Sequence, residues 1–413
     1  MLKILKIKVN GFKMLKDDFE INLTTRARVY SKDLIKEIIK IDDGLYTFTS
    51  LAFVGGNSSG KSTILTLILK TYIFIQTGRW EYVAREFNKD KISIYILFYL
   101  DKNLYSYSCD FLRLDPKTIS LENKYSPIIN EKLYVAKYDR TKGLKNIELF
   151  DLNKKEKKEL LQSSLNDTSA IVKLSKDNLL VDHFYTNNLT SFDDRIVRNT
   201  FFNVLNTCSI ELSTAIIKLL DDSIEYIICD NSNYVRFKRF NEKEIIISRF
   251  ELMCILSSGT LRGIELYIRG INALKDGKPF IVDEIESCFQ KNLVYNLLFL
   301  FNDSSINKKG AQLVFSTHYV EILDYLSRRD GIFITHKYNG KIDAKNLYSD
   351  FEVRTELLKS KQFDNNVFDT ALNYKQLIEV RRNVLNELQT NNDWRDCRII
   401  VFRSIIRKRF AYV

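Results

Sequence analysis

Residues 53–65, FVGGNSSGKSTIL, contain Gly55 and Gly60 with four residues between them, followed directly by Lys61 and Ser62. This spacing fits the phosphate-binding pattern G-x-x-x-x-G-K-[ST]. The two glycines allow the backbone to curl, so that successive N–H groups point at an anion. Lys61 offers a positive charge to the β- and γ-phosphates, and the Ser62 hydroxyl can ligate Mg²⁺. The stretch therefore predicts a phosphate-binding loop.

The flanking sequence gives this loop the context that it requires. Residues 45–54, LYTFTSLAFV, are typical of a strand, and residues 61–80 predict a long apolar helix that begins at the loop. Such a helix presents its positive dipole end to the same anion. We therefore expect the whole loop to contact a nucleotide, through Gly55, Asn57, Ser58, Ser59, Gly60, Lys61, Ser62 and Thr63.

A second apolar stretch, PFIVDEIES (residues 279–287), ends in adjacent carboxylates at Asp283 and Glu284. A strand ending in this way can place one carboxylate beside a metal ion and the other beside a water molecule. Asp283 is the candidate for the Mg²⁺ side, and Glu284 is the candidate base that orients the attacking water. Alone this pair is a weak signal, but together with the phosphate loop it predicts nucleotide hydrolysis.

Two further segments fit the same chemistry. In LVFSTHYVEIL (residues 313–323), His318 follows an apolar strand, and a neutral imidazole there could contact the γ-phosphate or hold the attacking water. In LSSGTLRG (residues 256–263), Ser257 and Gly259 precede an apolar helix and offer a hydroxyl and N–H groups to an anion. An ordinary helix N-cap is the alternative reading of that serine.

Composition indicates a folded, reduced protein. The 413 residues are 45% hydrophobic and 28% charged, and no apolar run is long enough to predict a membrane span. Six scattered cysteines, without a Cys-x-x-Cys pair, indicate reduced thiols and a cytoplasmic location. The net charge of +11 is compatible with nucleic acid, and it is equally compatible with a solvated Lys-rich surface.

Pattern changes along the chain predict four parts. We expect one half of an α/β nucleotide-binding core at 1–87 and the other half at 251–340, with an inserted strand and helical lobe at 88–250. Within that lobe a turn at 101–103 and a hairpin turning at 230–233 are predicted. Residues 341–413 form a C-terminal extension, in which Leu377, Val380, Val384 and Leu388 have helical spacing.

These segments, in this order, resemble the ABC-type ATPase heads of the RecF/SMC/OLD branch. The phosphate loop resembles the Walker A motif, and LSSGT (256–260) stands where that family has its signature LSGGQ. IVDEIESCF (281–289) resembles Walker B, and FSTHYVEIL (315–323) resembles the switch-histidine segment. KIKVNGFKMLKD (6–17) resembles the opening strand and turn, which implies that Phe12 and Lys13 approach the nucleotide. No glutamine loop can be assigned, and Thr260 replaces the glutamine of transporters.

The resemblance implies an ABC-ATPase head, a P-loop core with mixed sheets, split by an α+β insertion and followed by a helical extension. It implies hydrolysis of ATP with Mg²⁺ in a homodimer or higher homo-oligomer, where Ser257 and Gly259 of one subunit cap the ATP held by the other. Small chains of this shape resemble the ATPases of AbiL-type abortive-infection and PARIS-like anti-phage systems. That likeness implies a separate effector, such as a nuclease or toxin.

Two alternatives remain. A RecF-like DNA-binding ATPase in repair would use the net charge and a basic end at Arg403, Arg407, Lys408 and Arg409, for which a solvated helix face is the competing reading. A transporter subunit is disfavoured by the missing glutamine loop and the RecF-like N-terminus. An intrinsic nuclease of the OLD type is not expected, because no Asp-x-Asp follows residue 340.

Overall fold

The computed structural model describes residues 2–115, 117, 124–141, 158–162, 184–185, 201–229, 233–288, 290–352, 357–368, 370 and 378–388. The chain divides into two compact units, Met1–Phe368 and Asp369–Val413. The first unit contains both large sheets and every site residue discussed below. In the second unit, residues 378–388 are helical, as the apolar spacing predicted, and Val380, Val384 and Leu388 are exposed on that helix. Leu377 lies outside the described residues.

The first sheet is antiparallel and has the order β2-β1-β6-β7-β8-β9. Its strands are β1 (Lys3–Asn10), β2 (Phe19–Asn22), β6 (Lys91–Leu100), β7 (Asn103–Leu112), β8 (Ile128–Lys137) and β9 (Lys158–Gln162). The predicted turn between β6 and β7 is confirmed. Asp101 and Lys102 both have positive φ, 48° and 64°, which is the backbone that a two-residue hairpin turn with right-handed strand twist requires.

The second sheet has the order β10-β14-β15-β5-β16-β17. Its strands are β5 (Ser50–Val54), β10 (Phe184–Tyr185), β14 (Pro279–Val282), β15 (Gln312–Thr317), β16 (Ile332–Tyr338) and β17 (Lys341–Asn346). All neighbours pair in parallel except β16 and β17, which are antiparallel. Every residue of β5, β14 and β15 is buried, as expected for strands covered on both faces.

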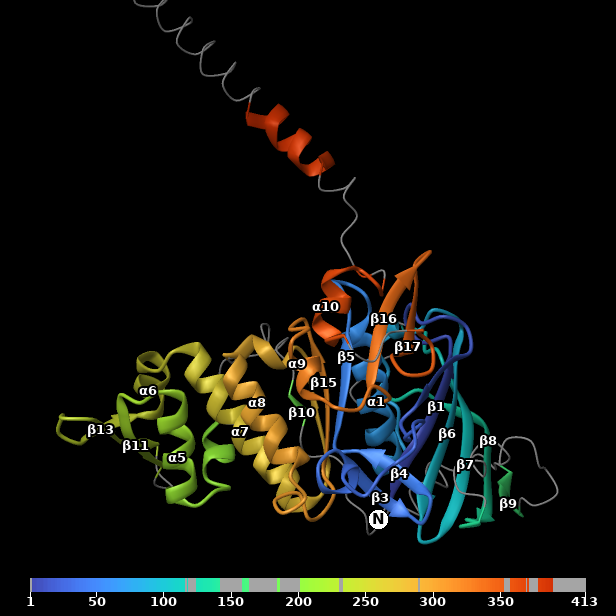
Figure 1. Ribbon diagram of the computed structural model, residues 1–413, viewed down its shortest axis with the longest axis horizontal. Helices are drawn as coiled ribbons and strands as arrows, with labels where there is room; N and C mark the ends of the chain where they lie inside the picture. The colour runs from blue at the N-terminus through green and yellow to red at the C-terminus, as the bar shows by residue number, and fades with distance from the viewer. Residues whose placement is uncertain are drawn as a thin grey trace, which may run out of the picture. The chain divides into compact units, whose positions relative to one another are not determined.

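Two hydrophobic cores lie on the two faces of this second sheet. Leu51 and Phe53 of β5 join helix α1 (Lys61–Thr77) and the inner face of the first sheet in one core. Ala52 and Val54 join α7 (Ser258–Asp276) and α8 (Lys291–Asn302) in the other. Figure 1 shows the resulting layers, with α1 between the two sheets and α7 and α8 on the far side of the second sheet. The alternation along β5 therefore fixes which helices cover which face.

The smaller elements complete the first unit. A hairpin of β3 (Ile38–Asp42) and β4 (Leu45–Phe48) precedes β5, and a sheet of β11 (Ile224–Cys229), β12 (Tyr234–Arg239) and β13 (Ile245–Ser248) lies beside α5 (Ile210–Leu220) and α6 (Arg249–Ile255). The other helices among the described residues of this unit are η1 (Asp33–Ile35), η2 (Ala84–Glu86), η5 (Ile285–Cys288), α9 (Ile322–Tyr325) and α10 (Lys359–Asp364), and residues 201–205 are also helical.

The mixed α/β class is as predicted, and so is the antiparallel β11–β12 hairpin, although residues 230–232 of its turn are outside the described part. The four-part division of the chain stays a prediction. In the structure, β6 and β7 hydrogen-bond into the sheet of β1 and β2, so strands from both sides of residue 88 share one sheet. Among the described residues, no helix is long and apolar enough to cross a membrane.

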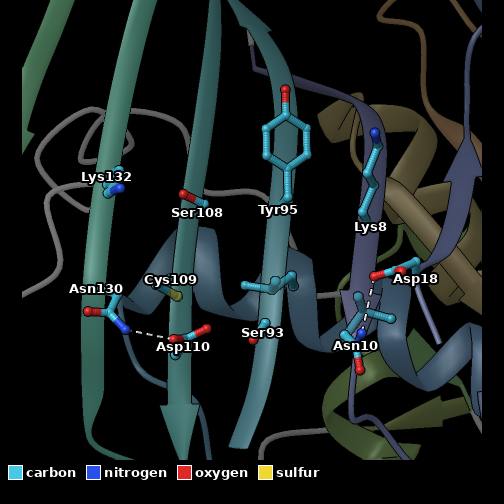
Figure 2. A pocket seen from close by; sticks show the side chains of 12 residues that line it. Lys8, Asn10, Asp18, Ser93, Tyr95, Ser108, Cys109, Asp110, Asn130 and Lys132 are labelled. Atoms are coloured by element: carbon cyan, nitrogen blue, oxygen red, sulfur yellow. Dashed lines mark hydrogen bonds between the residues drawn. The ribbon is translucent and has the colours of Figure 1, made fainter. Parts of the chain in front are cut away.

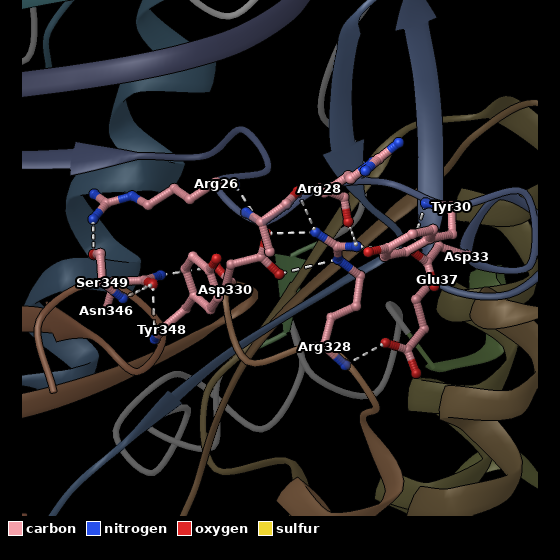
Figure 3. Close-up of polar contacts among 11 residues, drawn as sticks. Arg26, Arg28, Tyr30, Asp33, Glu37, Arg328, Asp330, Asn346, Tyr348 and Ser349 are labelled. Atoms are coloured by element: carbon pink, nitrogen blue, oxygen red, sulfur yellow. Dashed lines mark hydrogen bonds and ion pairs between the residues drawn. The ribbon is translucent and has the colours of Figure 1, made fainter. Parts of the chain in front are cut away.

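A buried charged cluster lies at the amino end of β16, and we call it the Arg328 cluster (Asp33, Glu37, Arg328 and Asp330; Figure 3). The Arg328 guanidinium donates to Asp330 at 3.0 and 2.6 Å and to Asp33 at 2.9 Å. Its remaining N–H groups reach the carbonyls of Arg28 and Ala27. Glu37 accepts the backbone N–H groups of Ser327 and Arg328. The cluster therefore ties the 26–37 segment to the second sheet.

Candidate nucleotide site

The predicted phosphate loop joins the carboxyl end of β5 to the start of α1. Gly60 is the N-cap of α1 and has φ 105°, a value that favours glycine. A Cβ there would lie 2.3 Å from Cγ2 of Ile342 in β17, and a Cβ at Gly55 would lie 2.3 Å from Oγ1 of Thr335 in β16. Both positions therefore require glycine, because Thr335 and Ile342 leave no space for a Cβ. The packing of β16 and β17 against the loop thus sets its shape.

Lys61 folds back over this loop. Its ammonium donates to the carbonyls of Gly55 and Gly56, each at 3.0 Å, and the residue is only 5% exposed. Burial lowers the pKa of the ammonium from its usual value, and the carboxylates of Asp283, Glu284 and Glu286 oppose this shift. The ammonium therefore donates to carbonyls of its own loop while these carboxylates favour its charged form.

The carboxylates come from the adjacent parallel strands. Asp283 and Glu284 follow β14 directly, and β15 lies between β14 and β5 in the sheet. Ser316 of β15 joins the two, since its hydroxyl donates to Asp283 at 2.5 Å and accepts the Glu284 N–H at 2.7 Å. Glu284 has φ 51°, an uncommon conformation for a residue with a side chain. Such strain is concentrated at functional sites, which makes this position a candidate for chemistry.

His318 follows β15 and lies beside Glu284. Its Nε2 is 3.8 Å from Oε1 of Glu284, and the two side chains are 33% and 46% exposed. The backbone N–H of His318 donates to Oε1 of Glu286 in η5. The other carboxylate oxygen of Glu286, Oε2, is buried and has no hydrogen-bond partner among the residues that the structure describes. This arrangement joins the segments after β14 and β15 at one edge of the sheet.

Lys13, assigned only through the family resemblance, lies near the same edge. Its backbone N–H donates to the Glu86 carbonyl at 2.6 Å, and the next residues pair with Ile342, which packs on Gly60. Burial lowers the pKa of the Lys13 ammonium, while Glu86 and, more weakly, Asp283 oppose that shift. The segment that carries Lys13 is therefore joined through Ile342 to the phosphate loop.

The signature turn (residues 256–260) lies away from the phosphate loop of its own chain. Ser257 caps α7 by accepting the Thr260 N–H at 3.0 Å, which confirms that this serine is a helix N-cap. Ser257 and Gly259 are both exposed, and a Cβ at Gly259 would meet only Ser257 Oγ, at 3.7 Å. Figure 1 shows α6 and α7 well to the left of α1, with the second sheet between.

Several contacting residues were not assigned from the sequence. The Thr335 hydroxyl lies 2.6 Å from that of Ser59 and reaches the Val54 carbonyl at 3.2 Å, so it fixes the loop from behind. Ser316 and Glu286 lie within segments that the sequence singled out, but neither was given a role there. Because Thr335 follows the phosphate loop by more than 250 residues, no local pattern pointed to it.

The donor set fits a Mg²⁺–nucleotide complex. Ser62 is exposed at the first turn of α1, and Asp283 is 5% exposed at the end of β14. Asn57 and Ser58 are exposed on the loop, and Ser58 has φ 59°. Thr63, at the first turn of α1, is half-buried. Hard oxygen ligands of this kind are those that Mg²⁺ prefers.

A trough of about 500 Å³ crosses the outer face of the first sheet but contains none of the predicted site residues (Figure 2). Two lysines, Lys8 and Lys132, and two aspartates, Asp18 and Asp110, line it. Asp110 already accepts from Lys91 and Asn130, each at 2.8 Å. Because the charges of the lining balance and Asp110 is already paired, the trough does not single out a ligand. The predicted basic end at Arg403–409 lies outside the described residues.

Comparisons with known proteins found similarity at the level of the fold. No protein-family model matches the sequence, and no curated protein matches it. The SMC head domain from Thermotoga maritima is 12% identical with a TM-score of 0.40, over 85% of this chain and 100% of that chain. An SmcHead bound to the C-winged helix domain of ScpA is 12% identical with a TM-score of 0.44, over 85% and 99%. These scores are too low to support a function, so the proposal below rests on the residues.

Proposed function

We propose that the chain binds and hydrolyses ATP with Mg²⁺, using the edge where β5, β14 and β15 end. The observation that supports this most is the convergence of Lys61, Asp283, Glu284 and His318 from segments far apart in sequence. A cation, two carboxylates and an imidazole beside a helix N-terminus are the groups that phosphoryl transfer to water requires.

Each group has a distinct role in this proposal. The loop N–H groups and Lys61 bind the β- and γ-phosphates, and Lys61 exchanges its bonds to the loop carbonyls for bonds to phosphate oxygens. Ser62 and Asp283 hold Mg²⁺, which neutralises phosphate charge when bound. Glu284 orients the attacking water and accepts its proton, and His318 Nε2 lies on the same side as a second contact to water or γ-phosphate.

The proposed working unit is a dimer with two composite sites. The phosphate loop covers one side of a triphosphate, and Ser257 and Gly259 present exposed donors at the N-terminus of α7, away from the loop of their own chain. In a two-fold dimer, each signature turn would complete the site of the other chain. ATP binding would then hold the dimer together, and hydrolysis would release it.

The biological output is the finer part of the proposal. Among the described residues, no group of three or more His, Cys, Asp or Glu could hold a metal ion, and the ATP site is the reaction centre that the side chains support. A regulatory ATPase that controls a separate effector fits this best, and anti-phage defence rests on the sequence resemblance alone. The alternative is a RecF-like DNA-binding ATPase.

A mixing experiment tests the composite site. Lys61→Ala removes the phosphate contact of one chain, and Gly259→Asp places a carboxylate on the signature turn, where the structure has room for it. Phosphate release from ATP is measured for each variant alone and for an equal mixture. Both variants alone should be inactive, whereas mixed dimers contain one intact site, so the mixture should recover about one quarter of the parent rate.

The outcomes separate the parts of the proposal. If the parent chain releases no phosphate from ATP, it is not an ATPase. If the parent chain is active but the mixture is not, or if Gly259→Asp retains the parent rate, the site is not shared between two chains.

A further inference from the structure

A second polar cavity, separate from the nucleotide site, lies at the opposite edge of the second sheet. We call it the basic cavity; its volume is about 260 Å³, and it lies between the β3 segment and the turn that follows α8. Thr49, directly before β5, and Gly310, shortly before β15, both line it. The phosphate loop follows the other end of β5, and the strand's 5 residues separate the two places by roughly 16 Å.

All formal charge in its lining is positive. Four of the lining residues are lysines, Lys36, Lys40, Lys308 and Lys309, and none is aspartate or glutamate. Lys40 pairs with Asp43 at 2.6 Å. For the ammonium groups of Lys36, Lys308 and Lys309, no carboxylate partner is found among the described residues. The cavity therefore differs from the trough of Figure 2, in which lysines and aspartates balance.

A buried amide points to the same kind of ligand. Asn302, at the end of α8, lines the cavity and is only 7% exposed. Its Oδ1 accepts the hydroxyls of Thr49 at 2.6 Å and Ser50 at 2.8 Å, which fixes the orientation of the amide. Its Nδ2 has no hydrogen-bond partner within the described residues. Because Asn302 lines the cavity and, in the described part of the chain, only the oxygen of its amide is engaged, the amide nitrogen is available to an acceptor in the cavity.

We propose that the basic cavity is a binding site for a phosphate group, held by Lys36, Lys308, Lys309 and the Asn302 amide nitrogen. Phosphate oxygens accept charged hydrogen bonds from ammonium groups and neutral ones from amides, which matches this donor set. The phosphate belongs either to a single-stranded nucleic acid or to a small free polyphosphate. The site does not depend on the proposed ATPase function.

The competing explanation is that Lys308 and Lys309 only complement the negative end of the α8 dipole. That role would change stability rather than ligand binding. The test therefore compares Lys36→Gln/Lys308→Gln/Lys309→Gln with a matched triple, Lys137→Gln/Lys243→Gln/Lys361→Gln. The second triple removes the same charge from exposed positions outside the cavity. Both are made in full-length Lys61→Ala protein, so that the phosphate loop does not contribute.

Two probes distinguish the two sources of phosphate. Binding of a fluorescein-labelled single-stranded oligonucleotide is followed by anisotropy across a salt series, and binding of inorganic pyrophosphate is followed by calorimetry. The cavity triple should lower the affinity for at least one probe by about tenfold or more, and the matched triple should lower it by no more than about twofold. With the oligonucleotide, the slope of log affinity against log salt should also fall by about 2, since three contacts are lost.

If the cavity triple weakens binding of the oligonucleotide, the phosphate comes from nucleic acid. If it weakens binding of pyrophosphate alone, the phosphate comes from a small polyphosphate. Asn302→Asp, which replaces the amide donor with a carboxylate, should reproduce the loss with all lysines intact. Because Asn302 is buried, the exposed lysine triple decides the test if that variant does not fold. Equal effects of the two triples on both probes, or no effect of either, would overturn the proposal.

Discussion

The Arg328 cluster and the nucleotide edge both carry charged side chains, at opposite ends of the second sheet, but they differ in how the hydrogen bonds of these side chains are satisfied. Arg328 directs its guanidinium at two carboxylates and two carbonyls, and its residue is 9% exposed. At the nucleotide edge, the Lys61 ammonium donates to carbonyls of its own loop, and Glu284 has a left-handed backbone. Within the described part of the chain, the buried Oε2 of Glu286 has no hydrogen-bond partner.

From this difference we infer that the Arg328 cluster stabilises the fold, whereas the nucleotide edge is arranged for ligand binding. A buried charge network with all donors used stabilises one conformation, and removing a member leaves uncompensated charge. An edge with strained backbone, half-exposed carboxylates and incomplete hydrogen bonding is arranged for a ligand that supplies the missing partners. Substitutions at the two ends should therefore change different measurements.

The largest expected effect is on stability, at Arg328. Arg328→Ala leaves Asp33 and Asp330 buried without their cation, so the free energy of unfolding should fall by about 3–5 kcal/mol in a urea titration. Arg26→Ala is the matched control. Arg26 pairs with Asp350 at 3.6 Å on the surface, and its loss should cost no more than about 1 kcal/mol. Equal losses in the two variants would mean that the cluster does not stabilise the fold as a unit.

A smaller effect, on catalysis, is expected at Glu286. Glu286→Ala removes the acceptor of the His318 N–H, so the imidazole shifts relative to Glu284 and ATP hydrolysis should slow by about 10- to 100-fold. ATP affinity and the urea midpoint should stay close to the parent values. Glu286 would then act by positioning His318, so Glu286→Ala should cause no further loss of rate in a His318→Ala background. Independent, additive effects of the two substitutions on the rate would contradict this role.

Ser257 tests whether the signature turn has a role beyond its own helix. Ser257→Ala loses the N-cap of α7 and should lower the free energy of unfolding by about 1 kcal/mol. If the serine also completes the site of a second chain, ATP-dependent dimerisation should weaken in addition, as followed by light scattering. Ser258→Ala, one residue into the helix, is the control for both measurements. If Ser257→Ala lowers the free energy of unfolding but leaves dimerisation unchanged, Ser257 acts only as the N-cap of α7.

The smallest effect concerns the support behind the loop. Thr335→Val removes the hydroxyl that contacts Ser59 and should weaken ATP binding by about fivefold, equivalent to about 1 kcal/mol. Thr335→Ser, which retains the hydroxyl, should bind as the parent does. Titration with a fluorescent ATP analogue measures both, and equal weakening in the two variants would assign the effect to the lost methyl packing.

The sequence predicted those parts of the site that depend on local constraints. The loop between β5 and α1 requires glycine at positions 55 and 60, because neither has room for a Cβ, and such constraints leave a visible spacing. Likewise, Asp283 and Glu284 were recognisable as polar residues ending an apolar strand. Both signals are contained within about ten residues.

The rest depends on contacts between distant segments. Nothing local shows that β15 lies between β5 and β14, that Thr335 supports Ser59, or that Ile342 packs on Gly60. The same reason explains why β6 and β7 were expected in an inserted lobe, whereas in the structure they pair with the sheet of β1. Antiparallel partners can be far apart in sequence, and alternation predicts a strand without naming its neighbour.

Glu284→Gln tests the central claim most directly, since it changes one carboxylate to an amide of the same shape at the strained position after β14. Phosphate release and the mass of the ATP-bound species are measured together. The account predicts that release falls at least about 100-fold while an ATP-dependent dimer accumulates and the free energy of unfolding stays within about 0.5 kcal/mol of the parent value. A variant that hydrolyses ATP at the parent rate would contradict the account.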